Sequence, residues 1–256
     1  MAVVSYREQD LVAVVTLERP EALNSFDRAL RVELVAALER AAGAPARAVV
    51  LAAAGRGFSA GADLKDVQPA GPDVEQILLN EFAPGIRAIA EMPKPVIAAV
   101  QGFASGIGAA YVLASDLVVM GASAFLHIPF VRIGLLPDGG LCWHLARQLG
   151  HQRAFELAAD GERLPAQRAR ELGLANKVVA DDAVEREALA WAARLAAQAP
   201  LALARTKAAL RAAATLPLAD TIALEARLQK ECAASADFAE GITAFFAKRP
   251  GQFTGR

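Results

Sequence analysis

The stretch KPVIAAVQGFASGIGAAYVLASDLVVMG (residues 94–121) decides the fold class. PVIAAVQG (95–102) has the apolar composition of a buried strand, and GIGAAYVLAS (106–115) predicts a helix of small residues. LVVMG (117–121) predicts a second buried strand. Strands that alternate with helices in this way indicate an α/β fold with parallel strands.

The same stretch is apolar enough to raise the question of a membrane span. Between Lys94 and Arg132 the only formal charge is Asp116. However, Asp116, Pro129 and several glycines interrupt the run. The sequence therefore predicts a buried strand, helix and strand of a globular protein, and no membrane association.

The strand and helix unit also occurs earlier in the chain. Two strands are predicted at 3–8 and 11–18, and a helix follows Asp27, which suits the N-cap position. RAVVLAA (47–53) predicts another buried strand, and the pattern over 73–91 indicates a helix. Repetition of the unit favours an α/β fold made of successive turns.

The last third of the chain has a different pattern. After Gly139 it becomes mainly helical, with one strand candidate, NKVV (176–179). Helices are predicted at 183–198, 200–214, 217–233 and 235–246. We therefore expect a core of ββα units over 1–195 and a C-terminal helical region over 196–256, which packs either on a partner subunit or on its own body.

Composition and charge exclude several classes of protein. Hydrophobic residues make up 55% of the 256 residues, and the net charge is −1. The chain therefore lacks the excess of positive charge that would attract nucleic acid or acidic membranes. Two cysteines (Cys142, Cys232) and three histidines give no disulfide framework and no metal-ligand spacing. Charged residues near the N-terminus argue against a signal peptide, so we expect a reducing cytoplasm.

GRGFSAGADLKD (55–66) contains a literal match to the G-x-S-x-G nucleophile elbow, centred on Ser59. A working elbow needs a helix directly after the serine, and Ala-Gly-Ala-Asp is a poor helix start. None of the histidines that a triad would need has a distinctive setting: His127, His144 and His151. We therefore do not expect Ser59 to be a nucleophile.

These glycines and alanines suit another kind of chemistry. Small residues let backbone N–H groups approach a ligand closely, and a second such loop, 104–108, follows the strand at 95–102. Two backbone donors from two strand ends would form an oxyanion hole. No complete G-x-G-x-x-G occurs, so a dinucleotide site is not predicted.

Five motifs in order resemble the crotonase, or enoyl-CoA hydratase/isomerase, superfamily. They are ERPEALNSFD (18–27), GRGFSAGADL (55–64), KPVIAAVQGFASGIGAAYVLASDLVV (94–119), IGLLPDGG (133–140) and FAEGITAFFAKRPGQF (238–253). The resemblance covers essentially the whole chain. It implies a crotonase-like spiral of ββα units, an acyl-CoA thioester substrate with no cofactor beyond its coenzyme A, and a homotrimer or a hexamer formed from two trimers.

The resemblance also implies roles for particular residues. The oxyanion-hole donors would be the N–H groups of Ala62 and Ile107. Residues expected to border or bind the coenzyme A moiety are Ala22, Leu23, Ala60, Ala62, Asp63, Leu64, Lys65 and Lys248. The two lysines would supply charge to the phosphates, Lys248 from across a subunit boundary, or else be ordinary solvated charges.

The acid and base groups indicate the reaction. The two glutamates that hydratases of this family use align with Ala110 and Phe130, so both carboxylates are missing. Asp138 remains, and it matches the Pro-Asp pattern of family members that shift double bonds, including the phenylacetate-pathway isomerase. One carboxylate suffices for a 1,3-proton shift. The acyl pocket is expected at Ala110, Tyr111, Pro129 and Phe130.

Several alternatives stay open at this point. An Asp before Gly-Gly and a helical run is also a natural N-cap, which gives Asp138 a purely structural interpretation. Tyr111 and His127 suit core packing as well as an acyl pocket. A hydratase with unconventional residues or a catalytically silent CoA-binding subunit would also fit the missing glutamates.

Overall fold

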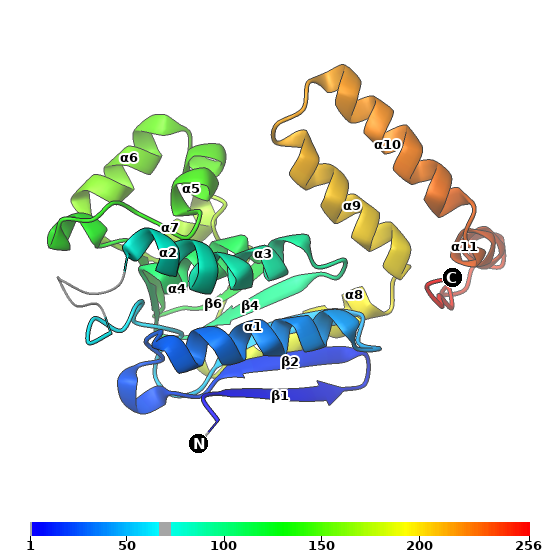
Figure 1. Cartoon of the computed structure of the whole chain (residues 1–256). Helices are drawn as coiled ribbons and strands as arrows, with labels where there is room; N and C mark the ends of the chain where they lie inside the picture. The colour runs from blue at the N-terminus through cyan, green and yellow to red at the C-terminus, as the bar shows by residue number, and fades with distance from the viewer. Residues whose placement is uncertain (1, 67–72) are drawn as a thin grey trace.

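The computed structural model describes residues 2–66 and 73–256, and its strands form two sheets (Figure 1). The larger, six-stranded sheet has the order β1-β2-β3-β4-β6-β9, antiparallel between β1 and β2 and parallel elsewhere. Its strands are β1 (Val4–Gln9), β2 (Val12–Leu17), β3 (Ala48–Ala53), β4 (Val96–Val100), β6 (Leu117–Gly121) and β9 (Lys177–Val179). The smaller sheet has β5 (Phe103–Ser105), β7 (Phe125–His127) and β8 (Arg163–Pro165).

The helices include the α/β connections and a C-terminal group. They are α1 (Arg28–Gly43), α2 (Val74–Ile77), α3 (Ala83–Glu91), α4 (Ile107–Ala114), α5 (Leu141–Leu149), α6 (His151–Asp160), α7 (Ala166–Glu171), α8 (Val184–Ala196), α9 (Pro200–Ala213), α10 (Leu218–Ala233) and α11 (Ala236–Phe246). Between α2 and α3 the chain forms a π-helical turn, Leu78–Phe82. Pro84, two residues after the end of this turn, has no N–H to donate to the preceding turn, which suits this widening.

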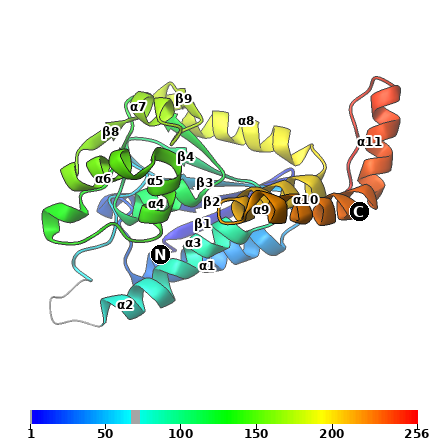
Figure 2. The ribbon, with the colours of Figure 1, turned by 90° about the horizontal axis from the view of Figure 1, so that it is seen from above.

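Alternate residues of the large sheet face two different cores. Val15 and Leu51 point to the side covered by α1 and α3, whereas Val14 and Val50 point to the side covered by α8. Figure 2 shows α1 and α3 on one side of the strands and α8 on the other. Because both faces are covered, the strands read as continuous apolar runs in the sequence.

Most of the expected elements are present. Asp27 caps α1 by accepting a hydrogen bond from the Leu30 N–H at 2.8 Å, as expected. The three strands of the small sheet were not predicted, and β8 lies in a region expected to be helical apart from 176–179. Each of these strands is three residues long, too short to show a period-two pattern.

The C-terminal helices α9, α10 and α11 extend away from the body of the protein (Figure 1). Asp116, the single charge of the apolar run, attaches α9 to the body. Its carboxylate accepts from the Nζ of Lys207 at 2.7 Å and lies 3.3 Å from the Nη2 of Arg211. Lys207 also donates to the Ile89 and Lys94 carbonyls. Thus the charge pairs with residues about 90 positions further along the chain.

No helix within the described parts of the chain is both long and apolar enough to span a bilayer.

Candidate active site

A mainly apolar cavity of about 290 Å³ lies where four segments of the chain meet. Both loops expected to supply oxyanion-hole donors line it, and so does Asp138. The remaining wall comes from the segment Val74–Phe82 and from residues 129–135. The large apolar side chains that line the cavity include Leu64, Val74, Ile77, Leu78, Phe82, Pro129, Phe130, Ile133 and Leu135. Asp66, Ser105 and Arg132 also line the cavity. The mainly apolar lining limits the contact of water with the groups beside it.

The first loop is held against the segment before α1 by a series of backbone hydrogen bonds. Ala60 N–H donates to Leu23 O (2.9 Å), Phe26 N–H to Gly61 O (2.8 Å) and Asp63 N–H to Phe26 O (3.1 Å). These bonds fix the residues on both sides of Ala62. The Ala62 peptide is therefore placed at the cavity without taking part in the pairing itself.

The second loop lies against the first. Ser105 N–H donates to Ser59 O at 2.9 Å, and Gly106 has φ 52° and ψ −127°, a conformation that only glycine adopts readily. A Cβ on Gly106 would lie 3.7 Å from the Cα of Gly61, so the two loops are in van der Waals contact. The turn at Gly106 brings the first N–H of α4, that of Ile107, to the cavity.

The two expected donors share one property. Neither the Ala62 N–H nor the Ile107 N–H has a hydrogen-bond acceptor among the residues that the structure describes. Both residues line the cavity, and Ile107 opens a helix, whose N-terminus carries partial positive charge. Free backbone donors at the wall of an apolar cavity can hold an oxygen that gains negative charge.

Among the described cavity residues, Asp138 is the one with a buried side-chain polar atom that lacks a hydrogen-bond partner. Its Oδ1 is buried and has no hydrogen-bond partner within the described residues. Burial raises the pKa of this carboxyl to about 6, and the residue's own N–H opposes the shift only in part. The next residue, Gly139, packs so closely on Ile107 and Ala110 that a side chain there would collide with both. Asp138 is thereby held beside the second loop.

The N-cap interpretation of Asp138 is wrong. Helix α5 begins at Leu141 after the cap residue Gly140, and no side chain caps it. The Asp138 contact to this turn is made by its backbone carbonyl, which accepts from Leu141 N–H at 3.0 Å. The carboxylate is therefore not tied to the backbone of the helix and stays available in the cavity.

Ser59 has a structural role. It is fully buried, its Oγ donates to Asn24 O at 2.8 Å, and it accepts from Gly61 N–H at 3.1 Å. No histidine contacts it among the described residues, and His127 pairs instead with Ser105 and Gly161. The serine fixes the turn of the first loop, in agreement with the expectation that it is not a nucleophile.

The expected acyl-pocket residues fall into two groups. Pro129 and Phe130 line the cavity, but Ala110 and Tyr111 do not. Ala110 is buried against Gly139. The Tyr111 ring stacks on Phe26 with centroids 4.8 Å apart, and burial raises the pKa of its hydroxyl far above the ordinary value. Tyr111 therefore belongs to the packed core next to the first loop.

The residues expected near coenzyme A are also divided. Ala60 and Leu64 line the cavity, and Leu64 is 60% exposed at its edge. Ala22 and Leu23 lie behind the first loop, without lining the cavity. Lys65 follows Leu64, whereas Lys248 follows α11 at the opposite end of the molecule (Figures 1 and 2). One chain does not bring the two lysines together.

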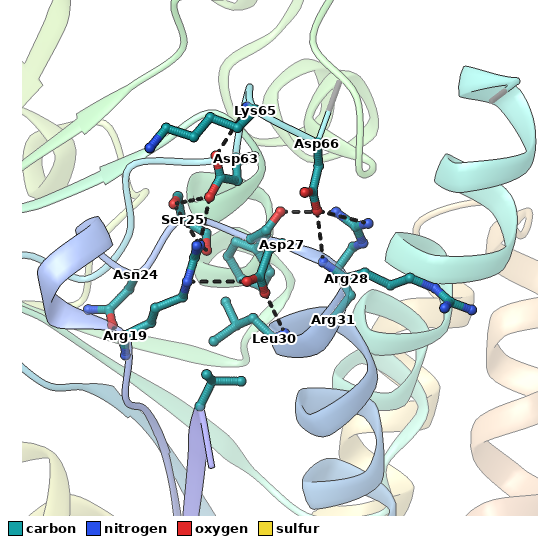
Figure 3. Close-up of polar contacts among 12 residues, drawn as sticks. Arg19, Asn24, Ser25, Asp27, Arg28, Leu30, Arg31, Asp63, Lys65 and Asp66 are labelled. Carbon is teal, nitrogen blue, oxygen red and sulfur yellow. Dashed lines mark hydrogen bonds and ion pairs between the residues drawn. The ribbon is translucent and has the colours of Figure 1, made fainter. Parts of the chain in front are cut away.

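Asp63 points away from the cavity into a network of charged residues (Figure 3). The Arg19 guanidinium pairs with it at 2.8 Å and holds the pKa of this carboxyl below its usual range. Arg31, nearly buried, pairs with Glu81 and donates to Phe26 O. Sequence reasoning missed both arginines, because their partners are distant in the sequence.

The cavity wall from α2 through the π-helical turn was also missed. Val74, Leu78 and Phe82 recur every four residues and all line the cavity. That apolar stripe was a usable signal, but it does not say whether a site or the core covers it. Within residues 2–66 and 73–256 no cluster of His, Cys, Asp and Glu could hold a metal ion.

Known proteins resemble this chain both in sequence and in fold. The model of the family described as enoyl-CoA hydratase/isomerase matches residues 7–256. A Rhodobacter capsulatus protein named "Probable enoyl-CoA hydratase" is 45% identical over 99% of this chain and 98% of its own length. The 1,2-epoxyphenylacetyl-CoA isomerase of Escherichia coli is 40% identical, covering 96% of this chain and 95% of its own.

Solved structures agree with these relatives. The crystal structure of an enoyl-CoA hydratase from Polaromonas sp. JS666 matches with a TM-score of 0.94 at 35% identity, over 98% of this chain and 99% of that one. The expected crotonase-like fold is therefore confirmed, and so is the resemblance to phenylacetate-pathway relatives.

Proposed function

The chain belongs to the enoyl-CoA hydratase/isomerase family, and from this premise we propose that it moves the C=C bond of a 3-enoyl-CoA to the 2,3 position. Asp138 acts as the single acid and base, and the Ala62 and Ile107 N–H groups form the oxyanion hole. The observation that supports this most is the buried, unpartnered Oδ1 of Asp138 in the cavity that both free donors line.

The reaction follows from these groups. With the thioester oxygen on the two N–H groups, the Asp138 carboxylate takes a proton from C2. The electron pair of the broken C–H bond moves toward the carbonyl, giving a dienolate whose oxygen the two donors stabilise. Protonated Asp138 then returns the proton to C4, which leaves the double bond between C2 and C3. No further cofactor enters this sequence.

The wall of the cavity supports the same chemistry. Phe130 is nearly buried and lines the cavity at a position where the family resemblance places a hydratase glutamate. Ala110, at the other such position, has no acidic group and lies beneath Gly139. An apolar wall keeps water from the dienolate and keeps the pKa of Asp138 high enough for proton transfer.

Hydration is the second candidate, because the relative with 45% identity carries a hydratase name. In that reaction water adds across the double bond of a 2-enoyl-CoA, and the product gains the mass of one water molecule. Of the two aspartates that line the cavity, Asp66 and Asp138, the carboxylate available for this work is that of Asp138, which has a buried oxygen with no partner within the described residues.

The two reactions are separated by giving the enzyme a 3-enoyl-CoA and crotonyl-CoA in separate incubations, followed by mass and absorbance detection. We expect the 3-enoyl-CoA to become the conjugated isomer with no change in mass, and the Asp138→Asn variant to lose this turnover. Turnover of crotonyl-CoA alone, with a gain of one water, would replace isomerisation by hydration.

The proposal includes the remaining expected contacts and the assembly. Ala60 and Leu64, with Ala22 and Leu23 behind them, would border coenzyme A, and Lys65 would meet its phosphates. A groove of about 480 Å³ between α9, α10 and α11, and the exposed Phe245 and Phe246, support packing of residues 196–256 on other copies in a trimer or hexamer. Light scattering after size exclusion would measure the mass of the assembly.

A further inference from the structure

Arg19 does not line the cavity, but it contacts both the first loop (residues 55–66, called the first oxyanion loop) and the segment before α1 with which that loop pairs. Its Nη1 donates to Asp63 Oδ2 (2.8 Å), Ser25 O (2.9 Å) and Ser25 Oγ (3.1 Å), and its Nε lies 3.2 Å from Asp27 Oδ2. Figure 3 shows the guanidinium between these groups.

The residue that Arg19 holds is the direct neighbour of a proposed oxyanion donor. Asp63 follows Ala62, and its N–H donates to Phe26 O while Phe26 N–H donates to Gly61 O. Ser25, another partner of Arg19, precedes Phe26. One guanidinium therefore links the loop after Ala62 to the segment with which that loop pairs.

The ion pair between Arg19 and Asp63 is largely shielded from solvent, so it can hold both side chains in one orientation. The side chains of Arg19 and Asp63 are 19% and 12% exposed. Ser25 Oγ lies 3.3 Å from the same oxygen of Asp63, and the Lys65 N–H bonds the other one at 3.1 Å. A planar guanidinium with several partners fixes orientation in a way that a single ammonium does not.

We propose that Arg19 is a positioning residue, which sets the direction of the Ala62 N–H by clamping Asp63 to the segment that contains Ser25. This inference rests on the proposed role of Ala62 in the oxyanion hole. Removal of the clamp leaves the cavity walls in place but lets the Ala62 peptide rotate. Substrate binding, which uses the whole cavity, then changes less than stabilisation of the charged intermediate.

The test measures the donor directly, with butyryl-CoA labelled with ¹³C at the thioester carbonyl. This saturated thioester can be neither isomerised nor hydrated, so the infrared frequency of its bound carbonyl reports the oxyanion hole alone. We expect a shift to lower frequency in the wild-type complex. In the Arg19→Met complex the band returns toward the value of free butyryl-CoA, although the thioester still binds.

Three further variants make the readout specific. Asp63→Asn weakens the clamp from the other side and is expected to lose part of the shift even if Arg19→Met fails to fold. Arg19→Lys restores part of it, because one ammonium replaces one of the contacts. Asp27→Asn is the matched control: it weakens a different pair of Arg19, keeps an N-cap for α1 and should retain the full shift.

Kinetics with a 3-enoyl-CoA give a second readout. If Arg19→Met displaces the Ala62 N–H, kcat should fall about 10- to 100-fold without a matching rise in KM. A folded Arg19→Met enzyme with the wild-type carbonyl band, or with raised KM and unchanged kcat, would overturn the inference.

The two proposals fail in different ways. A wild-type complex without any carbonyl shift would reject the oxyanion hole, and with it both the proposed function and the role of Arg19. A wild-type shift that depends on Arg19, in an enzyme that does not turn over 3-enoyl-CoA, would reject the isomerase and leave the positioning role standing.

Discussion

The first oxyanion loop and the Asp138 segment line the same cavity, but they differ in how their polar groups are hydrogen-bonded. In the loop, the side chains of Ser59 and Asp63 and the backbone on either side of Ala62 are paired. In the other segment, a carboxylate oxygen is buried without a partner. Hydrogen bonds hold a donor in place, whereas the lack of them raises the pKa of an acid. The site therefore has a rigid half, the two loops around Ala62 and Ile107, and a half proposed to be reactive, the Asp138 segment.

The largest effect is expected from the reactive half. Replacing Asp138 by Asn removes the proposed base from the cavity and keeps the shape of its side chain. Isomerisation of a 3-enoyl-CoA should fall about 10³-fold or more, within the range known for loss of a general base. Acyl-CoA binding, measured by calorimetry, should persist. A variant that still turns over would show that Asp138 is not the base.

The rigid half is tested next by Gly106→Ala. A Cβ at φ 52° and ψ −127° strains the backbone that aims the Ile107 N–H, so kcat should fall about 100-fold, the loss expected for one oxyanion donor. Gly173→Ala is the control, since Gly173 also has a positive φ (80°), with open space around it and no place in the cavity. Equal losses in both variants would mean that the fold, and not the donor, is affected.

Stability should respond with opposite signs in the two halves. Ser59→Ala leaves buried backbone groups unpaired and should lower the free energy of unfolding by about 1–3 kcal/mol. A carboxyl whose pKa is raised by folding lowers the free energy of unfolding at pH values above its unfolded-state pKa. Below that pKa the carboxyl is protonated in both states, and the effect disappears. Asp138→Asn should therefore raise the unfolding free energy by about 2 kcal/mol near neutral pH, and by nothing in acid. Urea unfolding at both pH values measures this.

The smallest effect is the pH dependence of the wild-type enzyme. Because the proposed base is the charged carboxylate, kcat/KM should rise with pH to a plateau, with its midpoint close to the Asp138 pKa of about 6. Below that point the rate should fall about tenfold for each pH unit. A profile with its midpoint near an ordinary aspartate pKa would place the working carboxyl in a wetter environment than this cavity.

The sequence predicts the rigid half better than the reactive one. Gly61, Ala62 and the Gly106-Ile107 turn lie in two short stretches. Their small residues suit either backbone donors or close packing, and the family resemblance implies the donors at Ala62 and Ile107. Asp138 also suited an N-cap, because the cavity that it lines is built from segments far apart in the chain and cannot be seen in the local sequence. Arg19 gave no signal at all, since its partner Asp63 lies 44 positions away. Contacts of this kind exist only after folding.

The pairing of Asp116 with Lys207 and Arg211 has a consequence for how the protein is made. The sheet leaves the ribosome before α9 does, and until α9 is synthesised Asp116 lacks the two cations with which it pairs in the folded protein. The body can reach its final electrostatic state only when the C-terminal helices are synthesised. A chain cut at residue 195 would then be an unfinished intermediate, one that chaperones and proteases would recognise, and not an independent catalytic module.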